Sequence, residues 1–434
     1  MENNINSALF DFIAACPSAF HTADTVAKRL ISAGYTELFE SGIWQLRPGG
    51  KYFTRRGGSS LIAFRAPESQ INGYMIMAAH GDSPAFRIKE SAETVNDGYR
   101  RVCVEKYGGM LCSTWLDRPL SAAGRVLVRT DKGLESRLVN IDRDLMLIPN
   151  VAIHMDRSAN EGKKFDVNVD MLPLLGLAAQ NAGLDSLVAE AAGAELGDIA
   201  ARELTVYCRS VGTVWGGNNE FISAPRLDDL QCVFGCLEGF MQAREKESAP
   251  VFCVFDNEEV GSGTKQGADS DFLSAVLHRI WTGLGLDEPG YLPALAQSMM
   301  VSADNAHAVH PNHPEYADRN DRPKMNGGIV IKYSANQKYA TDAVSAAVFG
   351  EICRRAGVET QRFTNRADLP GGSTLGNISS AHVSVDTVDI GLAQLAMHSA
   401  YETAGARDTE SLIRAACEFF SAGLRRSGDS IEIV

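Results

Sequence analysis

Residues 74–80, YMIMAAH, form an apolar run without alternating polar positions, and polar turns bound it on both sides. A strand with one exposed face alternates between apolar and polar residues, whereas a strand buried on both faces does not. A second apolar run predicts a strand at 250–256 and leads into Glu258 and Glu259. Both runs are typical of interior strands in a mostly parallel sheet, and such sheets bind their ligands at the carboxyl ends of the strands.

Predicted helices and strands alternate outside one central region. Residues 5–34 favour two helices and residues 59–66 a strand. From residue 226 onward, the hydropathy pattern predicts helices near 228–245, 269–284, 338–356 and 408–426, and strands near 250–256, 298–303, 360–364 and 383–390. This alternation predicts an α/β fold with a mixed, mostly parallel sheet flanked by helices.

The sequence changes character between residues 90 and 222. Short alternating segments rich in β-branched residues and separated by Gly, Asp and Asn predict antiparallel strands there: RVCVEKYG, GRVLVRT, LESRLVNI and ELTVYCR. A chain of 434 residues is long enough for two cores. We therefore expect a β-rich domain at 90–222, inserted into a split main domain made of residues 1–89 and 223–434.

Charge and composition narrow the class of protein. With 41 basic and 54 acidic residues the net charge is -13, which disfavours nucleic acid and anionic membranes as partners. No apolar stretch approaches the roughly 18 residues of a membrane span, and no Lys or Arg precedes the apolar N-terminal part as in a secretory signal. None of the nine cysteines forms a CxxC pair, and Cys232 and Cys236 fit the buried face of a helix. We expect a cytoplasmic protein.

The adjacent carboxylates of Glu258 and Glu259 lie in a glycine-rich turn. Like charges this close repel, so either one glutamate is protonated or a cation lies between them. For the pair alone, a solvated acidic turn is the competing interpretation. The rest of the chain decides between the two.

Residues of the types that bind metals occur at five places, and all but one directly follow a predicted buried strand. They are His80 with Asp82, Asp228 with Asp229, Glu258 with Glu259, Asp304, and His398. Each alone could be a core residue or a helix cap. Because parallel strands end on one side of a sheet, however, their terminal residues meet in one cleft.

The types of these residues indicate the chemistry. Imidazole and carboxylate without thiolate suit a catalytic site for zinc, manganese or cobalt. Two histidines and three carboxylates are too many for one open tetrahedral site, but they fit two ions about 3.5 to 4 Å apart that share a bridging carboxylate. One glutamate of the pair at 258–259 is then free to act as a general base on a water molecule.

Three further histidines, His307, His310 and His313, follow Asp304 at three-residue spacing. The two prolines of HPNHP break any helix that would align them. We expect loop residues here, with His310 nearest to the site.

Over nearly its whole length the chain resembles the aspartyl aminopeptidase family, a branch of the co-catalytic zinc aminopeptidases. The segments that carry the resemblance are, in order, AAHGDSPAFRIK, APRLDDL, FDNEEVGSG, SADNAHAVHPNHPE, IKYSANQKYA and LAMHSAYE. The resemblance implies a zinc-peptidase type of α/β fold and hydrolysis of the N-terminal residue of peptides. It also implies that the insertion mediates dimerisation and that dimers assemble into a tetrahedral dodecamer.

The resemblance further implies two divalent metal ions per subunit, zinc in the first place and manganese or cobalt as alternatives. In the family pattern, His80 and Asp304 bind one ion, Glu259 and His398 bind the other, and Asp228 bridges them.

Four other residues receive roles from the same pattern. Glu258 is implied as the general base and Asp82 as the residue that orients His80. His154, in the insertion, is implied to reach the site of a neighbouring subunit and hold the substrate carbonyl. Lys332 corresponds to a basic residue that favours an acidic substrate side chain.

The expected activity is therefore that of a metallo-aminopeptidase with a preference for Asp or Glu at the N-terminus. Segment 365–377 differs from that of members that accept only acidic residues, which leaves the preferred residue open. Another dinuclear zinc amidohydrolase, an amino-acid deacylase or a carboxypeptidase, is the alternative enzyme. A cargo-binding protein with a degenerate site would lack at least one ligand, and none is missing here.

Overall fold

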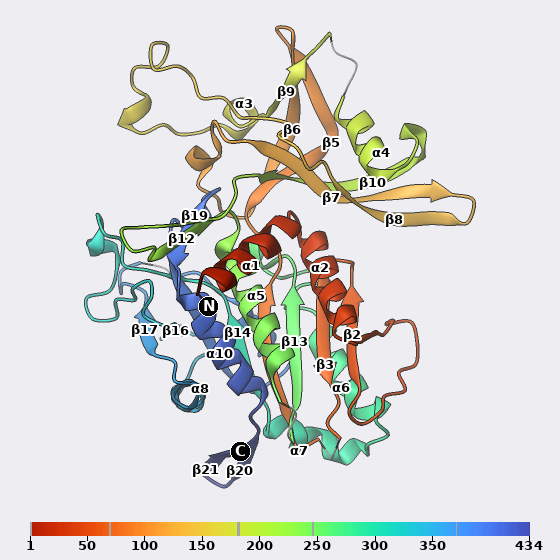
Figure 1. The fold of residues 1–434 in the computed structure, drawn as a ribbon, viewed down its shortest axis with the longest axis vertical. Helices are drawn as coiled ribbons and strands as arrows, with labels where there is room; N and C mark the ends of the chain where they lie inside the picture. The colour runs from red at the N-terminus through yellow and green to blue at the C-terminus, as the bar shows by residue number, and fades with distance from the viewer. Residues whose placement is uncertain (1, 69–70, 180–182, 245–246, 370) are drawn as a thin grey trace.

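The structure, a computed structural model, describes residues 2–68, 71–179, 183–244, 247–369 and 371–434. It contains a large mixed sheet with helices on both faces and a six-stranded antiparallel sheet that stands at one end of the molecule, at the top of Figure 1. The predicted fold class, a mixed α/β sheet with an inserted β-rich part, is confirmed.

The large sheet has 13 strands among the described residues, and its interior is parallel. Its strands are β1 (Thr36–Glu37), β2 (Lys51–Arg56), β3 (Ser60–Arg65), β4 (Tyr74–His80), β11 (Thr213–Trp215), β12 (Phe221–Ala224), β13 (Ala249–Phe255), β14 (Met299–Ala303), β15 (Ala306–His307), β16 (Ile329–Tyr333), β17 (Thr360–Thr364), β18 (Asp386–Leu395) and β19 (Glu402–Gly405). Strand β4 pairs in parallel with β13 and β14, and every residue of these three strands is buried. The interpretation of the non-alternating runs is therefore correct.

Alternate residues of β4 enter two separate cores, as expected for a strand covered on both sides. Met75 and Met77 belong to the core under α1 (Glu2–Ala15), α2 (Ala19–Ser32), α5 (Leu227–Gln242), α8 (Ala343–Ala356) and α10 (Asp408–Phe420). Tyr74 and Ile76 belong to the core under α6 (Phe272–Gly283), α7 (Tyr291–Ala296) and α9 (Leu375–Ser379). The helices thus sandwich the sheet.

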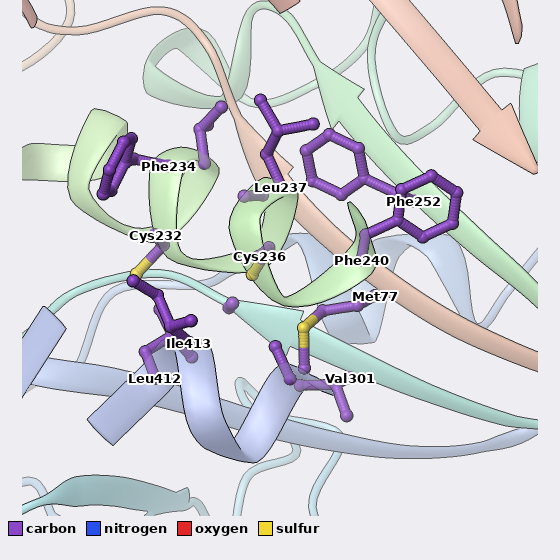
Figure 2. Packing of buried hydrophobic residues seen from close by; sticks show 14 of the residues in the cluster. Met77, Cys232, Phe234, Cys236, Leu237, Phe240, Phe252, Val301, Leu412 and Ile413 are labelled. Atoms are coloured by element: carbon purple, nitrogen blue, oxygen red, sulfur yellow. The ribbon is translucent and has the colours of Figure 1, made fainter. Parts of the chain in front are cut away.

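Helix α5 has Asp228 and Asp229 in its first turn and packs closely against α10. Cys232 and Cys236 are buried on α5, and Figure 2 shows both thiols directed into the core beside Leu412 and Ile413 of α10. A Cβ atom at Gly239 would lie 2.5 Å from Cβ of Ala416, so only glycine allows this approach. The prediction that the two cysteines are core residues is correct.

The small sheet has the strand order β8-β7-β10-β5-β6-β9, and all its pairings are antiparallel. Its strands are β5 (Ala85–Asn96), β6 (Tyr99–Tyr107), β7 (Leu120–Thr130), β8 (Gly133–Asn140), β9 (Leu174–Leu177) and β10 (Ile199–Cys208), accompanied by α3 (Val167–Asp170) and α4 (Leu184–Ala192). It has a core of its own around Phe86 and Trp115. The domain boundaries at 90 and 222 stay a prediction. Strand β11, inside that range, and β12, which crosses its end, pair in the large sheet.

Several predicted element ends differ from the structure for local reasons. The helix predicted from 338 begins at Ala343, because Asp342 caps its first turn by accepting a hydrogen bond of 2.8 Å from the Ser345 amide. The helix predicted to 426 ends at Phe420, and a hairpin of β20 (Leu424–Ser427) and β21 (Ser430–Ile433) follows. Strand β18 runs to Leu395 instead of 390, and the predicted last residue of the helix at 228–245 lies outside the described residues. In the described ranges, no helix is both long and apolar enough to cross a membrane.

Candidate metal centre

The predicted ligands meet at the carboxyl ends of the parallel strands. His80 is the last residue of β4, Asp304 directly follows β14, and Glu259 lies in the turn after β13. His398 lies in the turn after β18, and Asp228 lies at the start of α5 with non-helical backbone angles. Ligand atoms from these residues form overlapping groups in which all atoms lie within 4.8 Å of one another.

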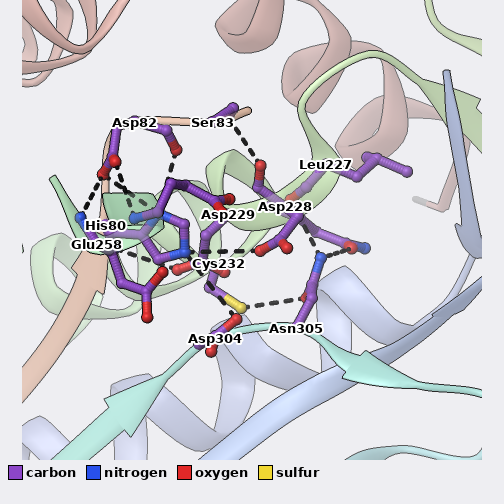
Figure 3. A network of polar contacts seen from close by, with 12 residues as sticks. His80, Asp82, Ser83, Leu227, Asp228, Asp229, Cys232, Glu258, Asp304 and Asn305 are labelled. Atoms are coloured by element: carbon purple, nitrogen blue, oxygen red, sulfur yellow. Dashed lines mark hydrogen bonds and ion pairs between the residues drawn. The ribbon is translucent and has the colours of Figure 1, made fainter. Parts of the chain in front are cut away.

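One half of the site surrounds His80. Its Nε2 lies 3.6 Å from Oδ1 of Asp228 and 4.0 Å from Oδ1 of Asp304, and Figure 3 shows the ring directed toward both carboxylates. These distances are too long for hydrogen bonds. Ligand atoms about 2.1 Å from a tetrahedral zinc ion lie roughly 3.4 Å apart, so the spacing of the first pair suits an ion between them.

The other half surrounds His398. Its Nε2 lies 3.4 Å from Oδ2 of Asp228 and 3.5 Å from Oε2 of Glu259. Asp228 therefore offers one oxygen to each half. Asp228 thus lies between the two histidines.

Both imidazole rings are oriented by a backbone carbonyl. Nδ1 of His80 lies 3.1 Å from the carbonyl oxygen of Asp82, and Nδ1 of His398 lies 2.5 Å from that of Gly109. A carbonyl oxygen only accepts, so Nδ1 is the donor in both rings. Each Nε2 then faces the carboxylates and can serve as a metal ligand once it is deprotonated.

The site holds more buried negative charge than its own hydrogen bonds can satisfy. Three buried oxygens have no hydrogen-bond partner: Oδ1 of Asp228, Oδ1 of Asp229 and Oε1 of Glu259. Burial raises the pKa of Glu259 well above its ordinary value. Unpaired buried carboxylate oxygens are costly, and a bound cation removes the cost. The residues present therefore fit divalent metal ions.

The two imidazoles respond to the same charge. Burial alone would lower the pKa of His80, but its contacts with Asp228 and Asp229 raise that pKa well above 6.5. Burial likewise opposes the effect of Asp228 on His398, whose pKa nevertheless rises to about 10. In the metal-free chain, the protonated imidazoles of His80 and His398 carry the positive charge that metal ions would otherwise supply.

Asp82 mainly fixes the turn that carries the two glutamates. Its carboxylate accepts hydrogen bonds of 3.2 Å from the amides of Glu258 and Glu259 and one of 2.6 Å from the hydroxyl of Tyr107. It lies 3.5 Å from Nδ1 of His80, farther than the Asp82 carbonyl. That the Asp82 side chain orients His80 stays a prediction.

Two supporting residues were missed in the sequence. Glu402 accepts hydrogen bonds from the amides of Asp228 (2.9 Å) and His398 (2.7 Å), so it holds the backbones of these two residues together. Its place four residues after His398, within LAMHSAYE, was an available signal. Tyr107 is the other, and its segment gave no such signal.

A pocket of about 160 Å³ opens over the ligands. Lys332, His307 and Phe363 contribute to its wall. The ammonium of Lys332 is buried and lies 3.3 Å from Oδ2 of Asp304. Burial opposes its charge, but Asp304 raises the pKa of Lys332 above its ordinary value, so the side chain is cationic.

The expectation for the histidine cluster is wrong in one respect. His307, which packs edge-on against Phe363 with ring centroids 6.0 Å apart, lines the pocket. His310 does not line it, and its ring contacts that of His313 at the exposed surface, with ring centroids 5.2 Å apart. The chain thus leaves the pocket between His307 and His310.

A larger cavity of about 450 Å³ lies between the turn that joins α1 and α2 and the small sheet, and it shares Asp228 with the pocket. The smaller pocket contains both histidines and is the candidate site.

His154 lies on an exposed loop of the inserted part. Among the described residues, no hydrogen bond or ion pair joins it to the ligands of its own chain. Its implied role toward a neighbouring subunit stays a prediction.

The comparisons with known proteins agree with this geometry. The family model described as aminopeptidase I zinc metalloprotease (M18) matches residues 12–420. A probable M18 family aminopeptidase 2 from Clostridium acetobutylicum is 44% identical over 432 residues, which cover 97% of this chain and 100% of the relative.

Two solved structures extend the likeness to the fold. A chain from the cryo-EM structure of the Ape4 and Nbr1 complex superposes with a TM-score of 0.93 at 35% identity, covering 97% of this chain and 86% of that one. The S. cerevisiae mApe1 dodecamer gives 0.84 at 27% identity, with 96% of each chain covered. The chain is thus a hydrolase of the metallo-exopeptidase class, and it belongs to the M18 family of zinc aminopeptidases, which resemble aspartyl aminopeptidase.

Proposed function

We propose that this aminopeptidase works with two divalent ions per subunit, zinc in the first place. His80 and Asp304 would hold one ion, His398 and Glu259 the other, and Asp228 both. The observation that carries the proposal is the position of Asp228, whose two oxygens lie 3.6 Å and 3.4 Å from the two histidine nitrogens. Bound there, the ions would polarise the scissile carbonyl and lower the pKa of a water molecule.

Glu258 is the general base in this proposal. In the metal-free chain, burial raises the pKa of Glu258 to about 7, and nearby metal ions would lower it and keep the side chain a carboxylate that can accept a proton. A ligand oxygen of this residue lies within 4.8 Å of those of His80 and Glu259. The carboxylate would accept a proton from the attacking water and return it to the leaving amine.

Replacement of Glu258 by Gln tests this role. Activity should fall by about 10²- to 10⁴-fold while zinc content stays at the wild-type level. Near-normal turnover with both ions bound would show that another group takes the proton. N-acylated substrates belong in the same assay, because a deacylase would cleave them and an aminopeptidase requires the free amine.

We also propose a preference for acidic N-terminal residues. It is supported by the cationic Lys332 in the pocket wall. A panel of Asp, Glu, Leu and Lys aminoacyl substrates measures the preference directly. Lys332→Met should lower kcat/KM for Asp and Glu more than for Leu; an equal loss for all would indicate that Lys332 serves only to hold Asp304.

Assembly is the third part of the proposal, together with a cytoplasmic location. The inserted part would form dimers and the dimers a tetrahedral dodecamer, with His154 of one subunit holding the substrate carbonyl of the next. Support comes from the dodecamer of the similar S. cerevisiae protein and from the exposed apolar neighbours Ile153 and Met155.

Mixed oligomers test the shared site. His154→Phe should lower activity without removing zinc, and Glu258→Gln should be nearly inactive. If sites are shared between subunits, co-assembly of the two variants restores part of the activity, because some sites receive both intact residues. Mixtures that show only the sum of the separate activities would contradict the shared site.

A further inference from the structure

Residues 107–111, from the last residue of β6 onward, leave the small sheet and lie against the candidate ligands of the large one. The hydroxyl of Tyr107 donates to Oδ2 of Asp82 at 2.6 Å and accepts from Nδ2 of Asn257 at 2.9 Å. The Gly109 carbonyl accepts from His398 at 2.5 Å, and the Leu111 amide donates to the His398 carbonyl at 3.0 Å. One short piece of the insertion thus contacts both sides of the candidate centre.

Tyr107 supports the turn of the two glutamates from both directions. Asp82, which accepts a hydrogen bond from the Tyr107 hydroxyl, also accepts hydrogen bonds from the amides of Glu258 and Glu259. Asn257, which donates to the same hydroxyl, directly precedes Glu258 and has a left-handed φ of 63°. Without the hydroxyl, the Asn257 amide loses its acceptor and the buried Asp82 carboxylate loses its shortest hydrogen bond.

The two glycines that follow allow the segment to come this close. Gly108 has a φ of +74°, and a Cβ atom there would lie 3.1 Å from Cβ and 3.4 Å from Oε2 of Glu259. Any larger residue would therefore be strained and would press on a metal ligand. His398 itself has a left-handed φ of 66°, so its turn depends on the bonds to Gly109 and Leu111.

We infer that residues 107–111 are a positioning element through which the insertion sets how tightly the His398 and Glu259 half binds its ion. The inference rests on the proposed metal centre and adds a role to the insertion besides assembly. Groups that hydrogen-bond to metal ligands typically change metal affinity by about 10- to 100-fold when they are removed. The His80 ring depends on the segment less directly: its Nδ1 partner is the backbone carbonyl of Asp82, whereas Tyr107 contacts the Asp82 side chain.

Tyr107→Phe tests the inference, with Tyr207→Phe as the matched control. Tyr207 lies on β10 of the same sheet, and its hydroxyl donates to Asn140 at 2.8 Å, away from the ligands. Competition with a zinc chelator measures the affinity of each ion on the purified, assembled protein. Tyr107→Phe should lower the affinity for one ion by about 10- to 100-fold, and Tyr207→Phe should bind both ions as tightly as the wild type.

Gly108→Ala is a second, steric test of the same segment. It should also lower the affinity for one ion. Gly176→Ala on β9 should not change either affinity, because a Cβ atom there would meet nothing within 4 Å. If Gly108→Ala does not fold, the tyrosine pair still decides. Wild-type affinities in both Tyr107→Phe and a folded Gly108→Ala would overturn the inference.

A further variant separates this failure from failure of the proposed function. His398→Ala should lose one ion outright. If it does, and Tyr107→Phe binds zinc like the wild type, the positioning role alone is wrong. If the wild-type chain binds no zinc, or His398→Ala binds it unchanged, the metal centre and the inference fail together.

Discussion

The two halves of the candidate centre use similar ligands but are held by different parts of the molecule. His80 ends a fully buried central strand, and its side chain is 1% exposed. Asp304 faces His80 with Oδ1, and its other oxygen, Oδ2, pairs with Lys332. The side chain of His398 is 32% exposed and lies in a turn beyond the end of β18. Its ring is held by Gly109 of the insertion. The parallel sheet builds the first half, whereas the second depends on how two sheets meet.

The largest expected effect comes from removing what the halves share. Asp228→Asn withdraws the charge that both histidines face, so both ions should be lost and kcat/KM should fall by roughly 10³-fold or more. Zinc content and hydrolysis of an aminoacyl substrate measure the two losses. Retention of one ion at wild-type affinity would show that Asp228 does not bridge.

Stepwise removal of metal should reveal the difference between the halves. Because the His398 side is the more exposed and is held by loops, a limiting chelator should remove its ion first. As chelator is added, zinc content should then reach a plateau at one ion per subunit, and the protein should already be inactive there. The half-loaded protein should match His398→Ala in zinc content; simultaneous loss of both ions would remove the distinction between the halves.

The pH dependence of stability should separate the metal-free and zinc-loaded proteins. The raised pKa of His398, about 10 against an ordinary 6.5, contributes stability that is complete below about pH 6.5 and is lost as the pH rises toward 10. In the zinc-loaded protein, the ion would take the place of the Nε2 proton, so this histidine would not titrate in that range. The gain in Tm on adding zinc should therefore grow from pH 6.5 to pH 9.

Thermal unfolding at several pH values, with and without zinc, gives the measurement. His398→Gln should flatten the pH dependence of the metal-free protein. A gain in Tm that stays constant with pH would mean that the imidazole is neutral before metal binds.

The sequence predicts the first half of the centre better than the second, and the reason is physical. The predicted strands at 74–80 and 298–303 end at their ligands, so local pattern and parallel geometry suffice for His80 and Asp304. The strand before His398 was predicted to end at 390 but runs to Leu395. His398 was among the candidate residues, but its assignment to an ion rested on the resemblance of LAMHSAYE.

Tyr107 shows what a sequence pattern cannot contain. RVCVEKYG is recognisable as a strand, and the strand is present as β6. The partners of the Tyr107 hydroxyl, however, lie 25 and 150 residues away along the chain. These contacts depend on how the small sheet packs on the large one. A local hydropathy pattern contains no information on such long-range packing.

The smallest expected effect lies at the outer edge of the contact between insertion and ligand turn. Thr114, from the insertion, accepts a hydrogen bond of 2.9 Å from the amide of Ala400, two residues after His398. Thr114→Val keeps the shape and removes the acceptor, at a cost of about 1 kcal/mol, which corresponds to roughly a fivefold loss of affinity for one ion. For comparison, Ser83→Ala removes a hydroxyl that donates to the carbonyl of Asp228, the residue that both halves share, so it should not favour one half. Chelator competition on Thr114→Val should show the weaker site at the His398 half alone, and a loss at the other half instead would mean that the insertion supports the whole centre equally.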